Sequence, residues 1–154
     1  MKPSPRCEAF IKAFEKCRLK AYLPTKNDVP TIGWGSTGPD IKLGMVWTQA
    51  QADARFAQDL ARFGAGVLRL LDGAPTTQGQ FDAMVSFAYN VGLDEDADTK
   101  AEGFGDSTLL KKHKAGDYAG AAAQFKFWNK QKGVVLAGLT RRRADETAMY
   151  LAKG

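Results

Sequence analysis

The chain has 154 residues with a hydrophobic fraction of 44%, which suffices for one domain with a buried core. Its net charge of +5 favours a polyanionic partner, such as nucleic acid, an anionic cell wall or a membrane surface. With one histidine and no CxxC motif, the sequence offers none of the common metal-ligand patterns, and we expect neither a metal nor a cofactor.

The N-terminus and the apolar runs give expectations about location. The opening residues, MKPSPRCE, contain no apolar stretch of the kind found in signal peptides. No apolar run is long enough for a transmembrane helix. We therefore expect synthesis and retention in the cytoplasm until another factor releases the protein, without stable insertion into a membrane.

The first predicted helix begins at Ser4 and Pro5, which suit the N-cap and the first helical position. Its apolar stripe is formed by residues at helical spacing: Cys7, Phe10, Ile11, Phe14 and Cys17. The two cysteines would lie roughly 15 Å apart, whereas a disulfide needs Cα atoms within about 7 Å. We therefore expect two buried free thiols, which suits a reducing compartment. Glu15 lies beside this stripe.

Residues 20–38 change to a strand pattern. Strand-forming residues are separated here by Pro, Asn and Asp: Tyr22, Val29, Thr31, Ile32 and Trp34. This pattern predicts a short antiparallel hairpin or a small three-stranded sheet. Three glycines would permit tight bends or a close approach of the backbone: Gly33, Gly35 and Gly38.

Two helices and an acidic loop follow. Thr-x-x-Gln capping boxes mark the two helix starts: Thr48 with Gln51, and Thr77 with Gln80. Gly64 and Gly66 are expected to weaken or bend the first of these helices. Residues 93–105 predict a surface loop. A metal-binding alternative rests on its acidic residues, whose spacing does not match an EF-hand: Asp94, Glu95, Asp96 and Asp98.

The C-terminal part predicts three more helices, with starts at Asp106 or Ser107, at Asp117 and at Thr140. Residues 130–138 are expected to form a loop whose apolar side chains are tucked in: Val134, Val135 and Leu136. The total of about six helices and one small sheet places the chain in the α+β class, mostly helical.

A lone carboxylate at a helix end, facing a hairpin, suggests a cleft with an acid in it. Glycoside hydrolysis needs a carboxylic acid that protonates the leaving oxygen, and a second group on the other face. Glu15 suits the acid, and the Thr31 hydroxyl suits a group that positions water. Asp28 is the nearest downstream carboxylate. A surface glutamate and a turn aspartate are the structural alternatives.

Four segments resemble, in the same order, the phage-type lysozymes, which are endolysins of glycoside hydrolase family 24. Residues 14–22, followed by Thr31-Ile32-Gly33-Trp34-Gly35, are similar to the active-site signature of that family. The other three segments are residues 81–92, 107–112 and 138–146. The resemblance implies one lysozyme-like catalytic domain over residues 1–154.

Within that domain, the resemblance implies an N-terminal helix and β-hairpin lobe at about 1–46. A connecting helix is expected at about 48–71, and a helical lobe at about 76–154.

The family pattern places an aspartate, sometimes a cysteine, after eight intervening residues from the glutamate, and a threonine after five more. Glu15 and Thr31 match its two ends. Pro24 stands where the aspartate is expected, and the separation of the ends is one residue longer.

Three interpretations of this rebuilt loop remain. Asp28 takes over the carboxylate role, or Thr25 or Asn27 holds the water, or the two matching residues suffice without a loop carboxylate. A second departure is Ser36, where the family often has histidine. We expect that difference to be structural.

The resemblance also implies contacts around the acid. One arginine of residues 141–143 is expected to reach back to Glu15 and pair with it. Arg142 is a candidate for substrate binding. Candidates for the sugar cleft are Tyr22, Trp34 and Asn90, whereas Trp47 and Trp128 are expected to anchor the core.

The implied activity is that of a muramidase that cuts the β-1,4 bond between N-acetylmuramic acid and N-acetylglucosamine by single displacement with inversion. We expect a monomer that is released by a holin and then acts on periplasmic peptidoglycan. The alternatives are a lytic transglycosylase and a non-enzymatic basic protein that disrupts wall or membrane. A nucleic-acid binder is disfavoured because no helix-turn-helix spacing or RNA-binding sheet signature is present.

Overall fold

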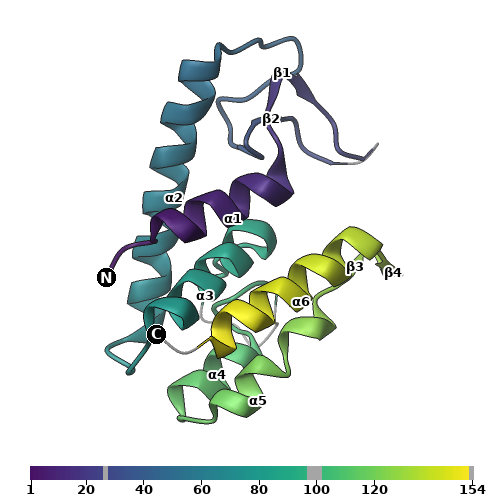
Figure 1. Cartoon of the computed structure of the whole chain (residues 1–154). Coiled ribbons are helices and arrows are strands. Elements are labelled where there is room, and N and C mark those ends of the chain that lie inside the picture. Colours follow the sequence, from purple (N-terminus) through teal and green to yellow (C-terminus); the bar gives the residue numbers. More distant parts are fainter. Residues whose placement is uncertain (26–27, 97–101, 153–154) are drawn as a thin grey trace.

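The computed structural model describes residues 1–25, 28–96 and 102–152. In that part the chain forms six α-helices, one 3₁₀ turn and two short antiparallel hairpins (Figure 1). The elements are α1 (Pro5–Glu15), β1 (Arg18–Tyr22), β2 (Thr31–Gly33), α2 (Gln49–Leu71), α3 (Gln78–Val91), α4 (Thr108–Lys114), α5 (Tyr118–Ala122), η1 (Phe125–Phe127), β3 (Lys130–Gln131), β4 (Val134–Val135) and α6 (Ala137–Leu151). The predicted α+β class, mostly helical, is confirmed, with one more hairpin than expected.

Most helices begin where the local sequence predicts, because a side chain satisfies the free N–H groups of the first turn. The Ser4 hydroxyl accepts a hydrogen bond from the Cys7 N–H, and both Thr-x-x-Gln capping boxes are complete. The predicted start of α6 is wrong. This helix begins at Ala137, and the Thr140 hydroxyl donates back to the Leu136 carbonyl instead of capping.

The end of α1 corrects the prediction for the second cysteine. Lys16 has φ 55° and ψ 142°, which ends the helix directly after Glu15. Cys17 therefore lies outside α1 and is only partly buried, with its Sγ 3.6 Å from the Gln49 amide nitrogen. Cys7 is fully buried, as expected, and both thiols are free.

The β1–β2 hairpin and the loops around it form a small lobe. The register pairs Arg18 with Gly33 and Tyr22 with Thr31, with an irregularity between the two pairs. The hydrophobic core of this lobe, as far as its residues are described, consists of Ala21, Ile32 and Ile41. We refer to residues 18–47 as the β lobe.

The helices from α3 to α6 pack with α1 and α2 around a second, larger core. Residues 79–88 of α3 are all buried, so this helix runs through the centre of the helical lobe. A Cβ on Gly79 would lie 2.7 Å from the Met149 carbonyl oxygen, so α3 and α6 approach each other at backbone distance. The long helix α2 runs along both lobes without interruption at Gly64 and Gly66 (Figure 1).

Residues 130–135 form a second hairpin, not the expected loop. Lys130 pairs with Val135 and Gln131 with Val134. The expectation that the following apolar side chains are tucked in is wrong: Val134 is 61% exposed, Val135 56% and Leu136 37%. A two-stranded ribbon offers little surface for burying side chains, so the apolar side chains of β4 remain more than half exposed. In the described residues, no helix combines the length and apolarity needed to cross a membrane.

Candidate active site

A cleft of about 630 Å³ lies between the β lobe and the part of the helical lobe that carries β3 and β4. Its walls bring together residues from both lobes that the sequence predicted for the site: Glu15, Tyr22, Asp28, Thr31 and Asn90. Two further predicted residues, Trp34 and Arg142, lie outside this wall. A volume of this size is typical of a ligand-binding cleft.

Glu15 is the last residue of α1, and its side chain is 18% exposed. Arg142 Nη1 lies 2.7 Å from Glu15 Oε1, which joins α6 to the end of α1. The other carboxylate oxygen lies against Gly35, where a Cβ would overlap it. Gly35 has φ +82°, so the close backbone approach expected for the glycines is observed at this position.

Arg142 is held from behind by buried polar groups of α3 and α6. Its guanidinium donates to the Ser86 carbonyl at 3.1 Å and lies 3.4 Å from Glu146 Oε2. The Ser86 hydroxyl donates to the same Glu146 oxygen at 2.6 Å. Arg143 completes the group, with its Nε 2.6 Å from Glu146 Oε1. We call Ser86, Arg142, Arg143 and Glu146 the arginine cluster.

The charges of the arginine cluster are almost entirely removed from water. Arg142 is 3% exposed, and neither Arg143 nor Glu146 is exposed at all. Burial raises the pKa of Glu146, whereas Arg143 and Arg142 oppose that shift through their positive charges. Burial also lowers the pKa of Arg143. We assign an ionised Glu146 between two cations, because a neutral Glu146 would leave the buried Arg143 without an ion-pair partner among the described residues and Arg142 with Glu15 alone.

Thr31 stands on the β-lobe side of the cleft, at the start of β2, and is 6% exposed. Its hydroxyl donates to the Val29 carbonyl at 3.1 Å, so its oxygen lone pairs remain as acceptors. Asp28 is partly buried, and its Oδ1 accepts the Val29 N–H at 2.9 Å. Asp28 is thus a turn residue and a cleft residue at the same time. Of the other loop candidates, Thr25 does not line the cleft, and Asn27 falls outside the described residues.

Aromatic and polar residues complete the walls. Tyr22 is stacked by the Arg18 guanidinium, 4.0 Å from its ring centre, and Asn90 follows Tyr89 near the end of α3. Tyr89, Phe127 and Trp128 also line the cleft, although the sequence did not indicate them as site residues. Phe127 is 63% exposed despite its apolar ring. An exposed apolar side chain in a cleft indicates a binding surface, but this exposure is known only from the folded structure.

Trp34 turns away from the cleft. Its indole N–H donates to Asp53 Oδ1 at 2.8 Å, and its ring packs edge-on against Phe56. Its carbonyl accepts the Tyr89 hydroxyl at 2.6 Å, so the backbone of Trp34 supports a residue of the cleft. The proposal below therefore does not use the Trp34 side chain as a sugar contact. Ser36 is fully buried and donates to Asp59 on α2 at 2.7 Å, which gives it a structural role.

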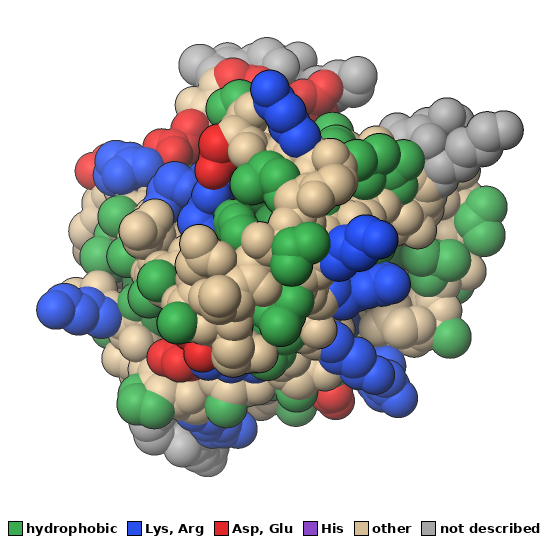
Figure 2. Space-filling model, turned by 90° about the horizontal axis from the view of Figure 1, so that it is seen from above, with side chains coloured by type: hydrophobic (Ala, Val, Ile, Leu, Met, Phe, Trp, Pro, Cys, Tyr) green, Lys and Arg blue, Asp and Glu red, His purple; other side chains and the backbone are tan. Residues whose placement is uncertain are grey.

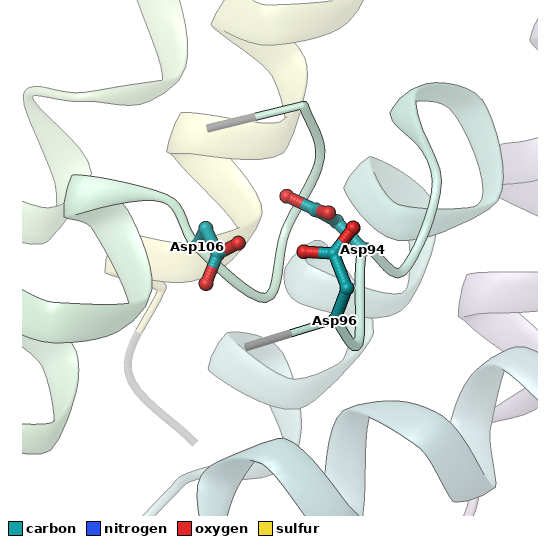
Figure 3. A group of neighbouring side chains, drawn as sticks. All are labelled: Asp94, Asp96 and Asp106. Carbon is teal, nitrogen blue, oxygen red and sulfur yellow. The ribbon is translucent and has the colours of Figure 1, made fainter. Parts of the chain in front are cut away.

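The acidic loop after α3 brings three carboxylates together (Figure 3). Ligand oxygens of Asp94, Asp96 and Asp106 lie within 4.8 Å of one another. Asp94 Oδ2 accepts the N–H groups of Glu102 and Gly103, so it organises the loop. Glu95 turns instead to Arg69 on α2, at 2.9 Å, and Asp98 is not among the described residues. We assign no metal to this group, since a set of neighbouring carboxylates does not by itself define a metal centre.

The fold and a glutamate that lines the interlobe cleft and pairs with a buried arginine are those of a lysozyme-type domain. The family model described as "Phage lysozyme" matches residues 12–146, and the chain belongs to that family. An endolysin of Bacillus phage PZA is 44% identical over 92% of this chain and 52% of its own length. An endolysin of Acyrthosiphon pisum secondary endosymbiont phage 1 is 39% identical over 92% of both chains.

The structure of an endolysin from Escherichia coli O157:H7 phage FAHEc1 is also similar. It gives a TM-score of 0.80 at 37% identity and covers 98% of this chain and 94% of that one. By contrast, the chain spans about half the length of the two curated relatives that head the sequence comparison, at 52% and 51%. The resemblance inferred from the four sequence segments is thereby confirmed.

Proposed function

We propose that this chain is a muramidase that hydrolyses the β-1,4 bond between N-acetylmuramic acid and N-acetylglucosamine in bacterial peptidoglycan. The observation that carries the proposal is the position of Glu15. Its carboxylate lies at a helix end in the wall of a cleft of about 630 Å³ and is fixed by a buried arginine. Family membership and relatives named endolysin support the same activity.

Glu15 acts as the general acid in this proposal. Arg142 engages Oε1, so the proton is carried by Oε2, on the side of Gly35. Protonation of the leaving oxygen from this position breaks the glycosidic bond as positive charge develops on the sugar ring. The fixed geometry matters because general-acid catalysis requires a donor within hydrogen-bond reach of the leaving oxygen.

Thr31 and Asp28 occupy the opposite side of the cleft, where water attacks. Because the Thr31 hydroxyl already donates to Val29, its oxygen accepts a hydrogen bond from water and so turns a water lone pair toward the sugar. Asp28 Oδ1 is engaged by the Val29 N–H, which leaves Oδ2 to accept the proton that water loses. A single displacement of this kind inverts the anomeric centre. Tyr22 and Asn90 contact the sugars in this proposal, whereas Arg142 acts through Glu15.

The test is digestion of purified peptidoglycan with product analysis by mass spectrometry. A muramidase releases fragments with reducing-end muramic acid, and the first anomer detected by NMR reports inversion. Anhydro-muramic acid would identify a lytic transglycosylase instead. Permeabilised membranes without new reducing ends would identify a disruptor that is not an enzyme.

Glu15→Gln tests the acid directly. The amide keeps the size and the contact with Arg142 but cannot donate a proton of comparable acidity. We expect turnover to fall by about 10²–10⁴-fold, the usual contribution of general acid–base catalysis, with an unchanged circular dichroism spectrum. Wild-type turnover in this variant would remove Glu15 from the mechanism.

Asp28→Asn separates the interpretations of the loop. The amide oxygen preserves acceptance from the Val29 N–H but removes the free charge. We expect kcat to fall by about tenfold or more while KM stays close to wild type. An unchanged kcat would leave Glu15 and Thr31 as the sufficient pair.

The same proposal includes the biological setting suggested by the endolysin relatives. The chain is synthesised in the cytoplasm of the host, acts as a monomer and reaches the wall after a holin opens the inner membrane. Cells that produce the chain alone should then continue to grow and should lyse when a holin is co-expressed. Lysis without a holin would contradict this route.

A further inference from the structure

The Tyr89 hydroxyl reaches from the helical lobe to the backbone of the β lobe. Tyr89 lies near the end of α3 and lines the cleft, where the reaction proposed above assigns it no role. Its Oη donates to the Trp34 carbonyl oxygen at 2.6 Å, across 55 positions of sequence. Its ring packs on two side chains of α2, with ring centres 5.8 Å away for Phe56 and 5.2 Å for Phe63. The ring supplies the packing, so the role of the hydroxyl lies in its contact with Trp34.

The carbonyl that accepts this hydrogen bond belongs to the peptide unit that joins Trp34 to Gly35. A Cβ on Gly35 would overlap Glu15 Oε2 and lie 3.1 Å from Glu15 Cδ, so the backbone of Gly35 lies directly against the carboxyl group. Oε2 is the oxygen that carries the proton in the proposed reaction, because Arg142 engages Oε1. The orientation of this one peptide unit therefore determines what surrounds the proton-carrying oxygen.

The turn that contains this peptide unit is closed at its two ends. The Ile32 N–H donates to the Ser36 carbonyl at 3.0 Å, and the Ser36 N–H donates to the Ile32 carbonyl at 2.9 Å. These bonds do not involve the Trp34–Gly35 peptide unit, which rotates through ψ of Trp34 and φ of Gly35. Type I and type II turns differ by such a rotation, and a glycine permits both because it adopts either sign of φ. A hydrogen bond to the Trp34 carbonyl selects one orientation, and Tyr89 donates that bond.

The surroundings of Tyr89 support a neutral phenol next to the acid. Burial raises the pKa of Tyr89, and the negative charges of Glu15 and Asp59 raise it further, whereas Arg142 and Ser36 oppose the shift. The phenol therefore keeps its proton at neutral pH. Because a phenol has one proton and this one is donated to the backbone, Tyr89 does not act as a second acid beside Glu15.

We propose that Tyr89 is a positioning residue of the reaction, whose hydroxyl holds the Trp34–Gly35 peptide unit against the proton-carrying oxygen of Glu15. This inference rests on the function proposed above and adds a residue of α3 to those that position the acid. With the peptide unit fixed, the carboxyl group has a backbone wall on one side and offers its proton from one direction. General-acid catalysis depends on such a geometry, because the donor must lie within hydrogen-bond reach of the leaving oxygen.

Tyr89→Phe tests this inference, because it removes one hydroxyl and keeps the ring beside Phe56 and Phe63. The release of reducing ends from soluble peptidoglycan fragments gives kcat and KM. We expect kcat to fall by about three- to tenfold, as for the loss of one neutral hydrogen bond, with KM within about twofold of the wild-type value. The Gly35 signal in a two-dimensional amide NMR spectrum should shift or broaden, because the peptide unit then samples both orientations.

Tyr118→Phe is the matched control. The Tyr118 hydroxyl also donates to a backbone carbonyl, that of Pro75, at 3.5 Å and outside the walls of the cleft. Both kcat and the Gly35 signal should remain at their wild-type values in this variant. Neither substitution changes a charged residue, so the Lys and Arg side chains on the face that Figure 2 shows are retained, and attraction to an anionic wall is the same in both variants.

A double variant separates positioning of the acid from a purely structural role. If the hydroxyl acts through Glu15, Tyr89→Phe combined with Glu15→Gln should retain the residual turnover of Glu15→Gln alone. A hydroxyl that only stabilises the fold would lower that residual turnover again, because effects of independent sites add.

Several outcomes would overturn the inference. Wild-type kcat or an unchanged Gly35 signal in Tyr89→Phe would show that the hydroxyl does not hold the peptide unit for the reaction. A higher KM with unchanged kcat would make Tyr89 a sugar contact instead. An equal loss in Tyr118→Phe, or a further loss in the double variant, would assign the effect to stability. Wild-type turnover in Glu15→Gln would instead contradict the proposed function, and this inference with it.

Discussion

The two sides of the cleft are built on very different amounts of buried structure. Among the described residues, three buried hydrophobic side chains form the core of the β lobe, whereas twenty form the core that α1–α6 share. The acid and its arginine belong to the larger core, through α1 and α6. Thr31 and Asp28 belong to the thin lobe.

This difference explains which part of the site tolerates change. The arginine cluster lies between α3 and α6, which touch at Gly79, so a substitution there disturbs packing on every side. Lengthening a surface loop such as the one between β1 and β2 costs only a small amount of loop-closure entropy. A longer loop with Pro24 in place of an aspartate is compatible with the fold for that reason.

We expect the largest difference between the two sides of the cleft from a substitution of Glu146 in the helical lobe. Glu146→Gln removes the carboxylate that Arg142 and Arg143 share, so that among the described residues the buried Arg143 loses its ion-pair partner and Arg142 keeps Glu15 alone. Breaking a buried ion pair on one side costs about 3–5 kcal/mol, and we expect a loss of that size in the free energy of unfolding from urea denaturation. Wall hydrolysis should also fall, because Arg142 loses a contact that fixes it against Glu15.

Asp145→Asn provides the control, since Asp145 is the exposed neighbour on the same helix. It should change the free energy of unfolding by less than about 0.5 kcal/mol. If Glu146→Gln lowered the free energy of unfolding by as little as Asp145→Asn, the arginine cluster would not contribute to the stability of the helical lobe.

A pair of core truncations compares the lobes directly. Ile32→Ala empties much of the β-lobe core, and Met84→Ala opens the helical core; both side chains are fully buried. Each should cost about 2–5 kcal/mol, with Ile32→Ala at the lower end because a thin core collapses more readily around a gap. Relative to the loss in the free energy of unfolding, the loss of wall hydrolysis should nevertheless be larger for Ile32→Ala. This substitution displaces the neighbouring Thr31 in the cleft.

Hydrogen exchange can separate global from local effects in these two variants. Ile32→Ala should speed exchange mainly in β1 and β2, whereas Met84→Ala should speed it throughout the helices. Uniform acceleration in both variants would mean that the lobes unfold as one unit.

The sequence correctly predicted those features that depend on interactions between residues close together in the chain. Ser4, Thr48 and Thr77 cap helices through bonds to residues three positions away, which a linear pattern records. The segments that resembled phage lysozymes likewise placed Glu15, Thr31 and Asn90 in one cleft.

The features that the sequence did not predict depend on the conformation and packing of the folded chain. Cys17 has the spacing of a buried helical residue, but the backbone of Lys16 ends the helix before it. Val134 and Val135 are apolar, yet both remain more than half exposed in their short hairpin. Glu146 is one helical turn from Arg142, a spacing visible in the sequence, whereas its complete burial depends on the contact of α3 with α6.

The smallest expected effect concerns His113, at the far end of the helical core. Its ring is 1% exposed and lies between two hydroxyls, with Nδ1 2.6 Å from Tyr150 Oη and Nε2 2.9 Å from Thr76 Oγ1. A neutral ring satisfies both, because one nitrogen donates and the other accepts. Burial lowers the pKa of His113 below its ordinary value of 6.5.

The sign of the resulting pH dependence follows from linkage. Between the lowered pKa of folded His113 and 6.5, the unfolded chain binds a proton that the folded chain does not. Stability from this group is therefore complete above pH 6.5 and is lost as the pH falls below it. The melting temperature should drop between pH 7.5 and pH 5 by a larger amount in the wild type than in His113→Gln. Equal drops would show that His113 does not contribute to the acid sensitivity of the helical core and that carboxylates set it.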